Sequence, residues 1–177
     1  MLQSICRKYS NTSKAYPLAA KCCTSFAVFG SADAASQLIV NQREDFSVMR
    51  SVRFATIGGC VMAPLFTAWY QFLDPMLPGK QYWYAKVLLE CVSIGPLYLG
   101  VMIWTNAALQ GLSLSEQTLR VRQDWWPLFI NALKVVPAYQ SVNFLFVPVE
   151  HRILWLNACQ FMWNVFVAYS VASRSSE

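Results

Sequence analysis

The sequence predicts an all-α integral membrane helix bundle, with four transmembrane helices plus interfacial or re-entrant half-helices. Hydrophobic residues make up 56% of the chain and charged residues 13%, whereas soluble proteins average about 45–50% and about 25%. The apolar residues also form uncharged runs long enough to cross a hydrocarbon layer about 30 Å thick as helices. With 177 residues the chain has room for one domain. We therefore expect a single transmembrane domain over residues 1–177.

The first predicted span, residues 18–40, carries Asp33 well inside it. An aspartate at a helix centre costs about 2.5–3.5 kcal/mol on insertion scales, so it should face the bundle interior or water. Gln37 lies four residues later and therefore shares its helix face. We predict that Asp33 lines a hydrated pathway, flanked by Gln37 and opposed by a cation such as Lys86 or Arg152.

The second predicted span, residues 54–73, follows a short polar loop at residues 41–53. It contains Gly58 and Gly59 side by side, and small residues at one level let another helix approach closely. Turn-forming prolines and a glycine follow Asp74. We therefore expect close helix contact at the two glycines and a tight connection into the next element.

The third predicted span covers residues 91–112. Gly95 and Pro96 should kink or break this helix one turn after its start, because proline cannot donate the helical hydrogen bond. Gly111 predicts its end, since glycine commonly terminates helices.

Residues 114–149 are predicted to be amphipathic and irregular. Ser115 is the expected N-cap of a charged surface helix. Pro137 divides the apolar run that follows into two stretches too short to span separately. We therefore expect interfacial or re-entrant half-helices, with a fifth crossing bent at Pro137 as the alternative. The fourth span is predicted at residues 153–173, which form an unbroken uncharged run.

Amide side chains recur at helical spacing along these segments. Any single amide is most simply explained by an interhelical hydrogen bond worth about 0.6 kcal/mol. Polar faces on several spans exceed what packing needs, and they favour a shared hydrated interior. The residues predicted to line a pore or form a polar core are Asp33, Gln37, Lys86, Asn106, Gln110, Gln140, Asn143, Arg152, Asn157, Gln160 and Asn164.

One extended motif lies in the C-terminal half. It reads N-x5-P-x2-Q-x2-N-F-x2-V-P-x3-R-x10-W-N and is carried by Asn131, Pro137, Gln140, Asn143, Phe144, Val147, Pro148, Arg152, Trp163 and Asn164. This order resembles the signature of the Mpv and 22-kDa peroxisomal membrane protein family, as does Gly-x2-Asp-x3-Gln in the first span. The chain departs from the family at Val136, where a tryptophan usually precedes the first proline.

The resemblance implies a function and a cellular location. Members of that family are small proteins of the mitochondrial inner membrane or the peroxisomal membrane, usually described as four-span proteins with pore-like permeability. We therefore expect a channel or pore-like protein that passes small solutes or metabolites and supports mitochondrial homeostasis. The alternative is a non-conducting structural or lipid-contacting scaffold whose buried amides serve only packing. The expected partners are the lipid bilayer and small-molecule solutes, and a homo-oligomer is left open.

The basic N-terminal segment indicates the location. The residues before Asp33 include no acid, while Arg7, Lys8, Lys14 and Lys21 are spaced among serines and apolar residues. This is the composition of a mitochondrial targeting segment. We expect a multi-pass protein of the mitochondrial inner membrane, with the peroxisomal membrane as the alternative.

Several function classes are disfavoured. The lysines and arginines punctuate the apolar runs rather than cluster, so we expect no nucleic-acid partner. The chain has one histidine, His151, and six cysteines without a C-x2-C pair, which argues against a metal site. It also lacks a nucleophile elbow, a P-loop and a dinucleotide fingerprint. We therefore expect no enzymatic activity and no cofactor.

Overall fold

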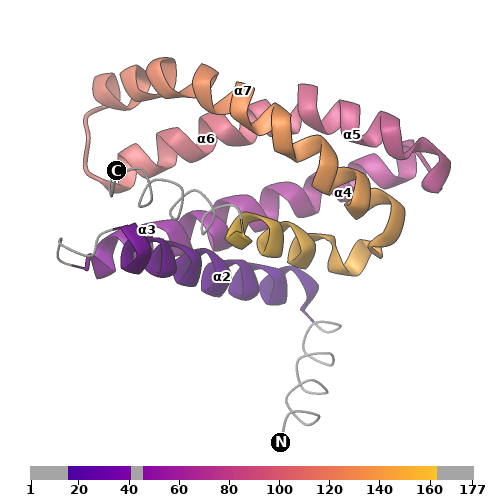
Figure 1. The fold of residues 1–177 in the computed structure, drawn as a ribbon, viewed down its shortest axis with the longest axis horizontal. Coiled ribbons are helices and arrows are strands. Elements are labelled where there is room, and N and C mark those ends of the chain that lie inside the picture. The colour runs from indigo at the N-terminus through magenta and orange to yellow at the C-terminus, as the bar shows by residue number, and fades with distance from the viewer. Residues whose placement is uncertain (1–15, 41–45, 163–177) are drawn as a thin grey trace, which may run out of the picture. The chain divides into compact units, whose positions relative to one another are not determined.

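The computed structural model describes residues 16–40 and 46–162, and its regular elements in these ranges are all helical (Figure 1). The expected all-α class is confirmed for this part of the chain. The helices form two compact units. The first extends to Thr67 and resumes at Leu156, and the second covers the residues between, from Ala68 to Trp155.

The first unit is built on a long helix packed against a helical segment with a wider turn. Helix α2 (Pro17–Val40) lies side by side with α3 (Val48–Thr56) and with the π-helix η1 (Ile57–Met62) (Figure 1). A Cβ atom added at Gly58 would lie only 2.5 Å from Cγ of Phe29. The predicted close approach at the paired glycines is therefore confirmed, because only glycine leaves room for this aromatic ring.

The second predicted span is longer than expected. One continuous helix runs over Val48–Met76, through α3, η1 and α4 (Ala63–Met76). The predicted polar loop at residues 41–53 is wrong from residue 48 onward. The cause is local, since Ser47 caps α3 by accepting a hydrogen bond from the backbone N–H of Arg50 at 3.3 Å.

The second unit packs one long helix against two shorter ones. After α4 the chain runs through η2 (Lys80–Tyr82), α5 (Trp83–Val92), α6 (Ile94–Leu109), α7 (Leu114–Phe146) and η3 (Val149–His151). Helix α7 lies along both α5 and α6, and α5 also contacts α6 (Figure 1).

The predicted break in the third span occurs at Ser93. Helix α5 ends just before this residue, whose φ of −120° and ψ of −83° are not helical. Pro96 explains the break, because its ring would clash with the carbonyl of Val92 in a regular helix. Helix α6 then ends at Leu109, and Gly111 has a φ of +78°, which confirms the predicted stop.

The third span begins earlier in the chain than the sequence predicts. The helical run covers Lys80–Leu109 rather than residues 91–112, so Lys86 and Glu90 lie inside it. Sequence hydropathy ends a span at charged residues. Here both charged side chains are buried and hydrogen-bonded to other elements of the second unit.

Helix α7 begins two residues before the expected position. Its N-cap is Ser113 rather than Ser115. The backbone N–H of Ser113 donates to Oε2 of Glu116 at 2.8 Å, and the Ser113 hydroxyl accepts from the Glu116 N–H at 3.5 Å. This reciprocal pair is a capping box. Hydrogen bonds from the Ser113 hydroxyl and backbone lower the pKa of Glu116 below its ordinary value.

The predicted half-helices in residues 114–149 are wrong. Helix α7 is continuous over 33 residues and includes both Pro127 and Pro137. A proline inside a helix costs about 3 kcal/mol, because it removes a hydrogen bond and crowds the preceding turn. Helix α7 packs along α5 and α6, and this packing outweighs the local cost. Because the helix continues through Pro137, the apolar stretches on either side of this proline form one helix. Their individual lengths therefore do not argue against a fifth crossing.

Two helices in the described residues are long and apolar enough to cross a membrane, Val48–Met76 and Lys80–Leu109. The predicted first span coincides closely with α2. Of the predicted last span, residues 153–162 are helical, and residues 163–173 lie outside the described residues.

Candidate functional site

The first unit contains a buried carboxylate surrounded by donors. Asp33 on α2 is 4% exposed. Its Oδ2 accepts hydrogen bonds from Gln37 at 2.7 Å and from the Ser51 hydroxyl at 2.9 Å, and its Oδ1 accepts from Nε of Arg50 at 3.0 Å. Both oxygens are thus held by protein groups from α2 and α3.

The predicted cation partner of Asp33 is wrong. Neither Lys86 nor Arg152 fills this role, because Arg50 binds Asp33 while both of those cations bind Asp74. The predicted flanking role of Gln37 is confirmed.

Gln37 joins α2 to the first turn of α3. Its Oε1 accepts from the backbone N–H of Ser47 at 2.9 Å, and its Nε2 donates to the Ser47 carbonyl at 3.1 Å. Because Ser47 is the N-cap of α3, this amide fixes the start of that helix against α2. These hydrogen bonds of Gln37 therefore hold α2 against the start of α3 beside Asp33.

A second polar contact in the first unit joins α2 to the final described helix. Nδ2 of Asn157 donates to the hydroxyl of Ser25 at 2.9 Å, and that hydroxyl lies 3.2 Å from Oδ1 of Asn157. Both side chains are fully buried. The amide predicted at Asn157 is therefore in the polar core, although its partner was not foreseen.

The second unit holds a cluster of one acid and two bases, which we call the Asp74 cluster. Oδ1 of Asp74 accepts from Nζ of Lys86 at 2.7 Å and from Arg152, whose NH1 lies 2.7 Å from both Asp74 oxygens. The side chains of Lys86 and Arg152 are 5% and 7% exposed, whereas that of Asp74 is 20% exposed. Two buried cations therefore share one partly accessible carboxylate.

Aromatic rings hold these cations in place. Lys86 Nζ lies 5.7 Å from the ring centroid of Phe144, and Cζ of Arg152 lies 5.0 Å from the same centroid. Arg152 also lies 5.6 Å from the ring of Tyr70, and the rings of Tyr70 and Phe144 meet edge to face. Cations over aromatic faces are stabilised by the ring quadrupole.

A network of uncharged donors surrounds a further buried acid. Gln140 donates through Nε2 to Oε1 of Glu90, and its Oε1 accepts from Asn143 at 2.7 Å. The Tyr70 hydroxyl accepts from Asn143 at 3.1 Å and from Gln140 at 3.4 Å. Oε2 of Glu90 and Oδ1 of Asn143 are buried and find no hydrogen-bond donor among the described residues. Among the described residues, this network therefore contains two buried acceptor oxygens without a donor.

The remaining predicted site residues lie as follows. Asn106 is half-buried and Gln110 is exposed on α6 and its end. Gln160 is half-buried in the final described helix, and Asn164 lies outside the described residues.

Sequence reasoning missed several members of the clusters, namely Ser25, Arg50, Ser51, Asp74, Tyr70 and Glu90. One signal was available for Glu90, since it lies four residues after Lys86 on the same helix face. Asp74 could have been suspected as the charge that closes an uncharged run. The others look like ordinary loop or interface residues in the sequence.

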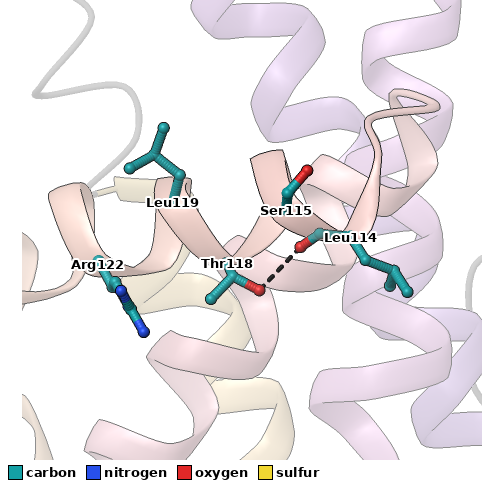
Figure 2. Close-up of a pocket in the computed structure, with 5 residues that line it drawn as sticks. All are labelled: Leu114, Ser115, Thr118, Leu119 and Arg122. Carbon is teal, nitrogen blue, oxygen red and sulfur yellow. Dashed lines mark hydrogen bonds between the residues drawn. The ribbon is translucent and has the colours of Figure 1, made fainter.

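A shallow hollow also lies at the beginning of α7. Figure 2 shows its lining residues, Leu114, Ser115, Thr118, Leu119 and Arg122, all on successive turns of that one helix. The Thr118 hydroxyl donates back to the Leu114 carbonyl at 2.8 Å. This is a surface feature rather than an enclosed site. In the described part of the chain, no group of three or more histidine, cysteine or acidic residues could hold a metal ion.

The regular elements of the described residues are helical, and two of these helices are long and apolar enough to cross a membrane. A model of the Mpv17 / PMP22 family matches residues 107–168, a range that contains the whole C-terminal motif. No solved structure matches the chain.

Full-length relatives support the same assignment. A mitochondrial inner membrane protein Mpv17 from Xenopus laevis is 29% identical over 92% of this chain and 94% of its own length. The Mpv17 protein of Caenorhabditis briggsae is 23% identical over 98% and 97%. Protein SYM1 of Gibberella zeae is 29% identical over 95% and 98%.

The predicted resemblance to the Mpv17 / PMP22 family is confirmed by this match and by these relatives. The location predicted from the basic N-terminus, the mitochondrial inner membrane, is confirmed by the two relatives that are named as proteins of that membrane.

Proposed function

We propose that the protein is a channel or pore-like protein that passes small solutes across the mitochondrial inner membrane. The observation that carries this proposal is Glu90, an acid buried within the span-length helix Lys80–Leu109 whose Oε2 finds no donor among the described residues. Ionisable side chains inside membrane helices are costly, and they commonly mark a pathway for solutes or ions. The proposed partners are lipids and small solutes, and the proposal involves no enzymatic step, cofactor or nucleic acid.

Four crossings are part of this proposal. They are α2, the helix Val48–Met76, the helix Lys80–Leu109 and the segment 153–173. A span of about 20 residues suffices for a hydrocarbon layer, and α2 has 24 residues. The acid that α2 carries, Asp33, is neutralised by Arg50, which lowers the cost of placing it in a membrane.

The alternative function is a non-conducting scaffold. The first unit favours it, because both oxygens of Asp33 are taken up by protein donors and Ser25 pairs with Asn157. Polar groups that satisfy one another contribute to helix association and need no pathway. The second unit supports the channel instead, since Glu90 and Asn143 retain acceptors without donors among the described residues.

Reconstitution into liposomes tests the proposal. The purified full chain is inserted into vesicles loaded with neutral and charged solutes of graded size, and their release is followed. A channel should release solutes below a size limit, whereas a scaffold should leave release at the level of protein-free vesicles.

Two variants locate the pathway. Glu90→Gln keeps the shape of the side chain and its acceptor for Gln140, so the protein should insert normally while its charge preference or release rate changes. The matched control is Arg50→Gln, which removes a charge from the first unit and should leave release unchanged. Equal release by wild type and Glu90→Gln would contradict a role for Glu90.

A further inference from the structure

The Asp74 cluster has more donors than its carboxylate can accept. Lysine offers three N–H donors and arginine five, and of these groups Nζ of Lys86 and NH1 of Arg152 reach the two oxygens of Asp74. Nε of Arg152 is buried and has no acceptor within the described part of the chain. The cluster therefore retains capacity for an anion.

Of the three side chains in the cluster, that of Asp74 can be displaced most easily. It is the most exposed of the three side chains. It also lies in the last turn of α4, where the negative end of the helix dipole disfavours a carboxylate. Lys86 and Arg152 are instead held over the ring of Phe144, so their positions do not depend on Asp74 alone.

Exchanging one anion for another preserves the charge balance of this region. The buried acid Glu90 takes its hydrogen bond from Gln140, which also donates to the hydroxyl of Tyr70. Whatever the charge on Glu90, a ligand carboxylate in the place of Asp74 leaves both cations paired. Arginine binds carboxylate and phosphate oxygens through its planar fork, and lysine acts as a point charge beside it.

We propose that Lys86 and Arg152 form a binding site for the carboxylate or phosphate group of a small anionic solute, and that Asp74 is the internal anion which this solute displaces. The inference rests on the proposed function in that it names the class of solute, but the binding itself requires no conduction.

Thermal unfolding of the purified full chain in detergent tests the site. Succinate and inorganic phosphate are titrated separately, each against chloride at equal ionic strength. Either oxyanion should raise the unfolding midpoint of the wild type, because a ligand that binds only the folded state stabilises it. Succinate alone would assign a carboxylate site, and phosphate alone a phosphate site.

Lys86→Gln is the deciding variant. It keeps the Arg152–Asp74 pair and should fold, but its affinity for the oxyanion should fall at least tenfold, about 1.4 kcal/mol. Arg50→Gln, which removes a cation from the first unit, should respond as the wild type does. The proposal is overturned if Lys86→Gln responds as strongly as the wild type, or if neither oxyanion exceeds chloride.

Asp74→Asn provides a second measurement by removing the internal competitor, so it should bind the oxyanion more tightly than the wild type. If Asp74→Asn does not accumulate, the comparison of wild type with Lys86→Gln still decides whether the site binds the oxyanion. Solute release without oxyanion binding would overturn this site alone, and binding without release would overturn the channel alone.

Discussion

Nε of Arg50 donates a hydrogen bond to Oδ1 of Asp33 at 3.0 Å, from a side chain that is 41% exposed while the acid is 4% exposed. The two partners should therefore differ in their contribution to stability. A buried carboxylate that loses its charge disturbs every donor around it. An exposed guanidinium that loses its partner can turn to water.

Asp33→Asn is expected to lower the free energy of unfolding by about 1.5–3 kcal/mol, the range for hydrogen bonds to charged groups. Arg50→Gln should lower it by only about 0–1 kcal/mol, as for an exposed ion pair. Thermal unfolding of both purified variants in detergent measures the difference. Equal destabilisation would show that the ion pair, rather than the hydrogen-bonded carboxylate, holds α2 against α3.

Gly58→Ala should destabilise the first unit. The added Cβ would lie 2.5 Å from Cγ of Phe29, and overpacking of this kind costs about 1–3 kcal/mol. Gly100→Ala is the matched control, since its nearest neighbour is 3.7 Å away on Trp125 and alanine favours the helix. Unfolding temperatures check both variants. A harmless Gly58→Ala would mean that Phe29 can move aside at little cost.

The first turn of α7 should loosen in acid. Hydrogen bonds from Ser113 lower the pKa of Glu116, so the carboxylate supports the capping box at neutral pH, and this support is lost as pH falls through the lowered pKa. The protection of the backbone amides in the first turn, measured as hydrogen exchange relative to the intrinsic rate at each pH, should decrease over that fall. Glu116→Gln should show no such pH-dependent loss of protection. Ser113→Ala should exchange quickly even at neutral pH, whereas Ser115→Ala should resemble the wild type.

Membrane topology offers a fourth prediction. Four spans place Asp45 and Thr118 on one side of the membrane, so Asp45→Cys and Thr118→Cys should be labelled from the same face by an impermeant thiol reagent. The six native cysteines are first replaced, because they would otherwise react. Labelling from opposite faces would mean that the number of crossings between these positions is odd and the four-span count is wrong.

Some features of this protein follow from the sequence alone because their causes are local. Pro96 lacks the N–H that a helix needs, so a break before it could be foreseen, and Gly111 takes the positive φ that ends α6. Gln37 lies one turn after Asp33 on the same face, so their contact is a consequence of helical spacing. The apolar runs likewise determine the helical class.

Other features were decided only by the tertiary structure. The partners of the charges depend on which helix faces meet, and single-helix spacing carries no such information: Asp33 binds Arg50, while Lys86 and Arg152 bind Asp74. The continuity of α7 through Pro137 has the same origin. A proline costs about 3 kcal/mol locally, and the packing against α5 and α6 that outweighs this cost comes from residues distant in the chain.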